Sequence, residues 1–201
     1  MPKTKEQYEA IKLERRNAIL NGALYLFAIH GYNATTSESI SKYVNCSHGL
    51  VYHYFPTKEK LFEELFESVI KIKHREIIKN IDFDEDPRFL IKDLLDAYLN
   101  ALKSEDDQYA CVIYLLLNIH LQKKYIPKPK NSDSRKRMYD LFETTIEKGK
   151  AQGLFYDDNL KESIIAILAM LKGLSFTRIH GGVKNFKCPS SEIISRLIIK
   201  R

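Results

Sequence analysis

The segment NCSHGLVYHYFPTK, residues 45–58, gathers the residue types in this chain that could do chemistry. It contains a cysteine, two histidines and three aromatic rings, which fit a metal site, an aromatic core or a surface that contacts a partner. A zinc site needs ligands that converge on one ion. His48 and His53 are five residues apart, so on one helix they point roughly 140° apart. The spacing therefore disfavours a metal centre, and we expect no metal and no cofactor.

The rest of the chain offers no pattern for catalysis. It lacks G-x-S-x-G, H-E-x-x-H and a glycine-rich phosphate loop, each of which would indicate a class of enzyme. Its three cysteines, Cys46, Cys111 and Cys188, form no C-x-x-C pair and are too scattered for a disulfide framework. We therefore expect a protein that is not an enzyme.

Composition indicates a globular protein with an anionic partner. The 201 residues are 44% hydrophobic and 29% charged, which is typical of soluble domains. The net charge of +6 suits a negatively charged partner. The first ten residues have no apolar core of a signal peptide, and the apolar run at 164–171 is about half the length of a membrane crossing. We expect a cytoplasmic protein that does not enter a membrane.

Helical periodicity recurs along the whole chain, and no alternating pattern of a β-strand stands out. The fold class is therefore predicted as all-α. Expected helices outside the opening segment cover residues 5–30, 58–80, 87–104, 107–124, 134–152, 159–180 and 190–200. The acidic stretch 82–87 ends in a proline and predicts a link between two parts of the chain. This predicts an N-terminal head (1–57), a connecting helix (58–80) and a larger helical body (81–201).

Within the head, residues 36–55 predict two short helices joined by a tight turn. Thr35 and Glu38 have the spacing of a capping box, Asn45 tolerates a left-handed turn, and Ser47 can cap the second helix. The apolar stripes predicted to face each other are Ile40, Tyr43 and Val44 on the first helix, and Val51, Tyr54 and Phe55 on the second. Together these features indicate a helix-turn-helix unit.

The residues left outside on the second helix are His48, Gly49, Leu50, Tyr52 and His53. A helix of this size fits the major groove of DNA, where small and polar side chains reach base edges. Lys58 begins the next helix, where a cation opposes the helix dipole unless a phosphate binds there. The N-terminal segment could add phosphate contacts from its basic residues Lys3, Lys5, Lys12, Arg15 and Arg16. The head is thus predicted to bind double-stranded DNA.

Residues 19–65 resemble the tetracycline-repressor (TetR) family of transcription regulators. The resemblance is carried by the helix end at Phe27, Gly31 and Tyr32, by Thr35–Thr36, Ile40, Ser47 and Gly49, by the cluster at 52–55, and by Lys58 with Leu61. The chain departs from the usual family pattern at Ser41, Val44, Asn45 and Cys46. The family implies a three-helix head braced by a fourth helix. It also implies a variable helical body that binds a small molecule and dimerises through its last two helices.

Carried over by position, the family implies phosphate contacts from Thr36, Ser47, Tyr52 and Lys58, and groove contacts from His48, Gly49, Leu50 and His53. Ser37 completes the predicted DNA-binding set. At the dimer interface we expect Leu171 and Ile194.

Inward stripes of the body helices supply candidates for a ligand pocket, although the same spacing also fits plain core packing. The candidates are Tyr98, Tyr109, Tyr114, His120, Met138, Phe142, Met170 and Phe176. For a cationic ligand the nearest carboxylates are Asp96 and Glu143.

The resulting hypothesis is a ligand-responsive transcription regulator that works as a homodimer. It would be a repressor that a small apolar or amphipathic effector releases from a palindromic operator. Two alternatives stay open: a helical DNA-binding regulator without an inducer, and a helical adaptor or scaffold protein.

Overall fold

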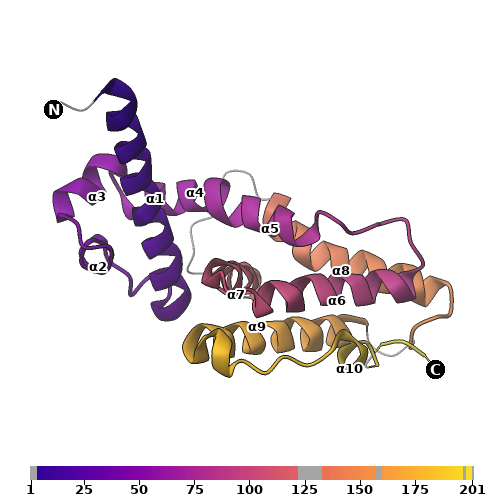
Figure 1. Ribbon diagram of the computed structural model, residues 1–201. Coiled ribbons are helices and arrows are strands. Elements are labelled where there is room, and N and C mark those ends of the chain that lie inside the picture. Colours follow the sequence, from indigo (N-terminus) through magenta and orange to yellow (C-terminus); the bar gives the residue numbers. More distant parts are fainter. Residues whose placement is uncertain (1–3, 122–132, 157–159, 197, 201) are drawn as a thin grey trace.

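The computed structural model describes residues 4–121, 133–156, 160–196 and 198–200. The prediction of an all-α protein is confirmed, since these residues form helices and a single isolated β-bridge. In order, the elements are α1 (Lys5–His30), α2 (Ser37–Tyr43), α3 (His48–Tyr54), α4 (Lys58–Leu65), the π-helical η1 (Phe66–Ile70), α5 (Lys71–Ile78), α6 (Pro87–Lys103), α7 (Asp107–Leu121), α8 (Asp133–Ala151), α9 (Leu160–Asn185) and α10 (Ser191–Ser195). Figure 1 shows α1–α3 at one end of an elongated molecule and α6–α10 at the other.

The helix α1 ends where the sequence predicts, but α2 begins differently. Gly31 stops α1 with a φ of 81°, a backbone conformation that glycine adopts without strain. The predicted capping box at Thr35 and Glu38 is wrong, because Thr36 and Ser39 form it. The Thr35 hydroxyl is buried and donates to the carbonyl oxygens of Leu26 and Gly31, at 3.1 and 2.8 Å. That hydroxyl serves the end of α1, so the next residue caps α2.

The turn between α2 and α3 has the predicted geometry. Asn45 adopts a φ of 52°, and Ser47 caps α3 by accepting the N–H of Leu50 at 3.2 Å. The prediction is wrong for one residue of the facing apolar stripes, because Tyr43 is 53% exposed. Its ring stacks on that of Tyr25 with centroids 5.2 Å apart. The tyrosine therefore covers the outside of α1 instead of entering the core.

The connecting helix runs without a break in helical backbone from α4 through η1 to α5. Four of its buried residues recur every four positions, namely Phe62, Phe66, Ile70 and His74, and Leu61 and Leu65 are buried beside them. In an ideal α-helix each four-residue step overshoots a full turn by roughly 40°. The wider π-helical turn at η1 reduces this drift, so that one side of the helix stays against the core.

The body packs α6, α7, α8 and α9 around a core that is continuous with that of the head. In Figure 1 the ribbons of α6 and α9 lie side by side, and the two helices contact each other. Helix α7 contacts α1 as well as α9, so the head touches the body at a second place besides the connecting helix.

Two predictions about the C-terminal region are wrong. The last helix ends at Ser195, and the backbone beyond it forms a bridge in which the N–H of Tyr156 donates to the carbonyl of Ile198 at 2.9 Å. This bridge draws the chain end away from a helical path. Leu171 and Ile194 cannot form an interface, because both are fully buried in the core of the single chain.

Candidate nucleic-acid interface

Helix α3 separates two kinds of residue. Val51 and Phe55, its C-cap, are buried in the head, whereas His48, Tyr52 and His53 are exposed. The rings of His48 and Tyr52 meet edge to face with centroids 4.8 Å apart, so each restricts the other. In Figure 1 this helix lies at the end of the molecule farthest from the body. An external partner can therefore approach α3 without meeting the body of the same chain.

Gly49 has no packing reason to be glycine. A Cβ atom built at this position would meet nothing within 4 Å beyond its chain neighbours and the backbone of its own helix, in contrast to Gly22, where it would overlap Val44. The φ of Gly49 is also not in the left-handed region. The bare backbone therefore leaves room on the outer side of α3, next to the half-buried Leu50.

Two exposed hydroxyl groups stand at the starts of α2 and α3. Thr36 Oγ1 accepts the N–H of Ser39 at 3.0 Å, and Ser47 Oγ accepts the N–H of Leu50 at 3.2 Å. Each hydroxyl accepts one backbone hydrogen and retains its own proton, which it can donate to an external acceptor. Ser37 is half-buried beside the first of them.

The cations of the head are engaged to different degrees. Lys42 pairs with Glu38 at 2.7 Å and, as its hydrogen-bond donor, lowers the pKa of that carboxyl. Arg16 pairs with Glu64 at 2.7 Å. Lys58 Nζ lies 2.9 Å from the Tyr32 carbonyl oxygen and 3.0 Å from that of Thr35. The predicted phosphate-binding lysine is thus directed into the head.

Arg15 contrasts with these residues, because within the described part of the chain it has no ion-pair or hydrogen-bond partner. It lines a groove of about 380 Å³ between α1 and the α2–α3 turn. The groove also contains Asn45, Cys46, Ser47 and Leu50. Partial burial raises the pKa of the Cys46 thiol. A guanidinium and a hydroxyl thus share one groove beside the start of α3.

The predicted ligand-binding residues occupy separate environments. Tyr98 and Phe142 are buried with ring centroids 5.8 Å apart, whereas Tyr114 contacts the exposed Phe176 at 6.0 Å. Tyr109 lies elsewhere and donates its hydroxyl to Glu76 at 2.8 Å. Met138 is buried and Met170 is half-buried. The side chain of His120 lies outside the described residues.

An open groove of about 440 Å³ between α5 and α6 contains Asp96, one of the carboxylates predicted for a cation, together with Tyr109. Glu76 and Asp93 also line it. The groove is therefore acidic, but the aromatic residues predicted with Tyr109 are not among those lining it.

Sequence reasoning missed a buried polar pair in the body. His74 Nε2 lies 2.7 Å from the Tyr98 hydroxyl oxygen, and both side chains are buried between α5 and α6. The four-residue repeat from Phe62 to His74 is the signal that places this histidine inside. Burial strongly raises the pKa of Tyr98, so its hydroxyl stays protonated.

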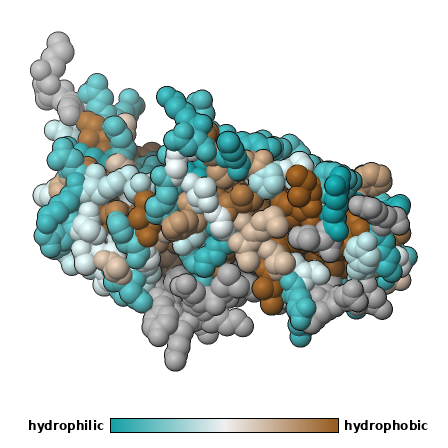
Figure 2. Space-filling model, turned by 90° about the horizontal axis from the view of Figure 1, so that it is seen from below, coloured by the Kyte–Doolittle hydropathy of each residue, from teal (hydrophilic) through white to brown (hydrophobic). Residues whose placement is uncertain are grey.

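Helix α9 presents an unusual surface. By length and composition the segment Lys161–Asn185 could cross a membrane, and 33% of its most apolar window is buried in the chain. The buried Arg178 and Ser175 lie within this helix and hydrogen-bond to backbone carbonyls, as in the core of a globular protein. Its exposed apolar residues include Ile165 and Phe176, and Ile193 is exposed on α10. Figure 2 shows apolar patches gathered over the body on the side where α9 lies.

Comparisons with known proteins find similarity to bacterial regulators in the N-terminal part of the chain. Residues 19–65 match the family described as bacterial regulatory proteins, tetR family. The HTH-type transcriptional regulator AcrR of Shigella flexneri is 30% identical over 105 residues, which cover 52% of this chain and 47% of AcrR. The regulator QacR of Staphylococcus aureus is 46% identical over 50 residues, covering 25% of this chain and 27% of QacR. The chain spans from about a quarter to about half of these curated relatives.

Solved structures resemble the whole chain in fold. A transcriptional regulator from Saccharomonospora viridis, solved in complex with choline, has a TM-score of 0.59 at 20% identity, covering 94% of this chain and 99% of that one. AibR, solved with isovaleryl coenzyme A and operator DNA, has a TM-score of 0.61 at 17% identity, covering 90% of this chain and 94% of that one. At this level of identity the likeness concerns the fold.

Proposed function

We propose that this chain is a ligand-responsive transcription regulator that binds an operator in the cytoplasm, because its residues 19–65 match the tetR family of bacterial regulatory proteins. The observation that carries the proposal is the two-sided character of α3. One side is buried in the head, and the other is polar, exposed and relieved of bulk at Gly49. A surface of this kind suits a helix that lies against the floor of the major groove.

The exposed residues of the helix-turn-helix unit fall into two groups, one that would contact phosphates and one that would contact bases. Thr36, Ser37, Ser47 and Tyr52 carry hydroxyl groups at the edge of the helix-turn-helix unit and would donate to phosphates. Such contacts position the protein but carry no sequence information. His48, Leu50 and His53 would face base edges, where they determine which operator is preferred.

A second copy of the chain is part of the proposal. One short helix makes few base contacts, and two copies of α3 about 34 to 36 Å apart reach successive major-groove faces of a palindromic operator. The exposed apolar residues on α9 and α10 would be covered by their counterparts in the second copy. Covering them removes apolar surface from water, which stabilises the dimer.

Regulation by a small effector is supported by the solved relatives, of which one holds choline and another holds isovaleryl coenzyme A together with operator DNA. We propose that an effector binds the body of this chain and releases a repressor from DNA. It can do so only through a difference in its affinity for the two states of the dimer. A typical coupling is about 5- to 150-fold in affinity. The alternative is a regulator without an inducer.

Selection of duplexes from a random DNA pool tests the proposal. Wild-type protein should enrich a palindrome, and the affinity for that palindrome should fall steeply with salt because phosphate contacts release counterions. Repeating the selection with a library of small molecules identifies the effector by loss of enrichment. A wild-type protein that enriches no sequence, and whose binding to duplex DNA does not depend on salt, would contradict the proposal.

A further inference from the structure

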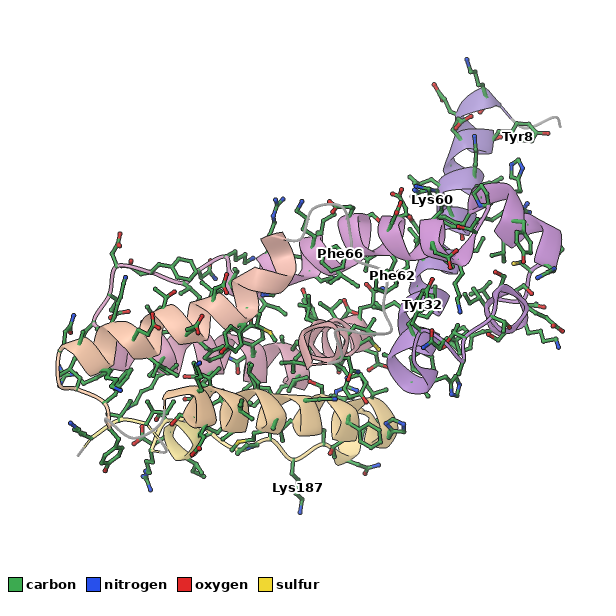
Figure 3. The ribbon with its side chains drawn as sticks, turned by 180° about the vertical axis from the view of Figure 1, so that it is seen from behind. Tyr8, Tyr32, Lys60, Phe62, Phe66 and Lys187 are labelled. Atoms are coloured by element: carbon green, nitrogen blue, oxygen red, sulfur yellow. The ribbon has the colours of Figure 1, made fainter. Side chains whose placement is uncertain are left out.

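The first half of α1 projects beyond the other helices of the head. The buried residues of α1 begin at Ile19, whereas residues 4–18 are exposed apart from the half-buried Ile11 and Arg16. Figure 1 shows this part of α1 extending past α3, and Figure 3 labels Tyr8 on it. We call residues 5–18 the arm. A helix rises about 1.5 Å per residue, which makes the arm roughly 21 Å long.

The arm is helical although most of it packs against nothing in the chain. Thr4 and Gln7 form a capping box at its start, with donor–acceptor distances of 3.0 and 3.3 Å. The packed half of α1 supplies the nucleus that an isolated helix of this length would lack. Leu13 and Tyr8 nevertheless stay 57% and 61% exposed. The sequence thus stabilises a helix whose side chains are presented to an external partner.

The charges of the arm are segregated by sign. Successive residues point roughly 100° apart around a helix axis, and on this spacing the cations of the arm all fall within an arc of roughly 100°. These cations are Lys5, Lys12, Arg15 and Arg16. The carboxylates that point outside the arc are those of Glu6, Glu9 and Glu14. One side of the arm is therefore cationic, and Tyr8 lies on that side.

The cationic side of the arm is also the side on which α3 lies. The buried Ile19 points into the middle of the same arc, and together with Arg15 it lines the groove beside the start of α3. At the other edge of the arc, the Arg16 guanidinium carbon lies 5.4 Å from the ring centroid of Phe55, at the end of α3. Lys12 points between these two directions, one turn farther along, so it projects past α3 on the same side.

We propose that the arm lies along the duplex that flanks each half-site and contacts its phosphates through Lys5, Lys12 and Arg15. The inference rests on the proposed DNA-binding function. Arg16 anchors the arm to the head by pairing with Glu64 at 2.7 Å. Lys12 and Arg15 have no ion-pair or hydrogen-bond partner among the described residues, so both can neutralise phosphates. Such contacts add affinity without reading sequence.

The dependence of affinity on duplex length tests the inference. Base pairs are spaced about 3.4 Å apart, so the arm reaches at most about six of them beyond α3. Two duplexes carry the selected palindrome, and one of them continues on each side for about ten base pairs of arbitrary sequence, beyond that reach. The wild type should bind the extended duplex more tightly and with a steeper slope of log affinity against log salt.

Lys12→Gln separates contact by the arm from the general effect of a longer polyanion. On the extended duplex it should reduce the salt slope by about 0.9 for each bound protomer, and on the short duplex it should leave the slope unchanged. Lys148→Gln is the matched control, because it removes the same charge from an exposed site on α8 of the body. It should leave both slopes at the wild-type values. Equal slopes of Lys12→Gln and the wild type on the extended duplex would overturn the inference.

The short duplex keeps this inference separate from the proposed function. A wild type that binds the palindrome but gains neither affinity nor slope from the extension would overturn the role of the arm and retain the proposed function. A wild type that binds neither duplex would overturn both. A lower sedimentation coefficient of Lys12→Gln in the absence of DNA would assign the arm to contact between copies of the chain, which would also overturn the inference.

Discussion

Arg178 and Asp107 form an ion pair of 2.7 Å in which the arginine side chain is 1% exposed and the aspartate side chain is 68% exposed. The buried guanidinium also donates to the carbonyl oxygens of Leu102 and Ser104, at 3.0 and 2.8 Å. These carbonyls lie at the end of α6, where no helical N–H reaches them. One side chain of α9 thus closes the end of α6 and contacts the first residue of α7.

Replacing Arg178 should lower the free energy of unfolding more than replacing its partner Asp107 does. Arg178→Met leaves two carbonyls without donors and should lower the free energy of unfolding by about 3 kcal/mol. Asp107→Asn affects an exposed partner and should cost less than about 1 kcal/mol. Urea unfolding at one protein concentration measures both variants. Equal losses would show that Arg178 stabilises the chain through its ion pair with Asp107 and not through its hydrogen bonds to the end of α6.

Gly22 should be intolerant of any side chain. A Cβ atom there would overlap Val44 and press on the Tyr43 ring, because the end of α2 packs against α1 at this point. Gly22→Ala should therefore destabilise the chain by about 1–3 kcal/mol. Gly49→Ala is the matched control in another helix and should raise stability by up to about 1 kcal/mol while weakening operator binding. Thermal unfolding and binding to the selected operator distinguish the two glycines.

Tyr52 and His48 should differ in what they contribute at the operator, although their rings touch. Tyr52→Phe removes one hydroxyl and should weaken binding to all duplexes by a similar factor. His48→Ala should change the preferred bases, with a discrimination of about 1–3 kcal/mol lost at one position of each half-site. Parallel selections with the three proteins measure this. The same consensus from His48→Ala and the wild type would place His48 away from the bases.

The proposed dimer should depend on exposed residues of α9 and α10. Ile165 is 55% exposed and Ile193 is 60% exposed, so a charge at either site changes little in the single chain. At micromolar concentration, Ile165→Glu and Ile193→Glu should each lower the sedimentation coefficient from the value of a dimer to that of a monomer. Phe89→Glu places the same charge on the equally exposed Phe89 of α6 and should leave the dimer intact. A monomeric wild type would refute this assembly.

Cys111 should make stability fall at alkaline pH. Burial raises the pKa of this thiol to about 12, from an ordinary value of 9.0. Between those values the unfolded chain loses the proton and the folded chain keeps it, so the free energy of unfolding decreases as pH rises. The wild type should lose up to about 1.4 kcal/mol per pH unit relative to Cys111→Ala in this range. Parallel pH dependences of the two proteins above pH 9 would exclude the effect.

Much of the helical layout follows from local signals in the sequence. Gly31 ends α1, Asn45 supplies the left-handed turn, Ser47 caps α3, and Pro87 begins α6 after its cap at Asp86. Each of these depends on the backbone preference or hydrogen bonding of residues within four positions. The outward face of α3 also follows from helical spacing, because the inward residues Val51 and Phe55 leave only one side for a partner.

Where two nearby residues could serve the same purpose, only the tertiary structure decided between them. Thr35 and Thr36 are both suitable caps, and contact with the end of α1 assigns the first to the core. Tyr43 has the spacing of a buried residue but stacks outside on Tyr25. Leu171 and Ile165 are both apolar residues of α9, and packing alone makes one core and leaves the other exposed.

Long-range polar contacts were likewise decided by the fold. The sequence determined that Lys58 begins a helix, a position that fits a phosphate contact as well as any other role. The structure turns its ammonium toward carbonyls 23 to 26 positions earlier in the chain. Arg178 reaches carbonyls 74 and 76 positions away in the same manner. Local preference specifies where a helix begins and which side is apolar, whereas a charged side chain takes whichever partners the assembled helices bring within reach.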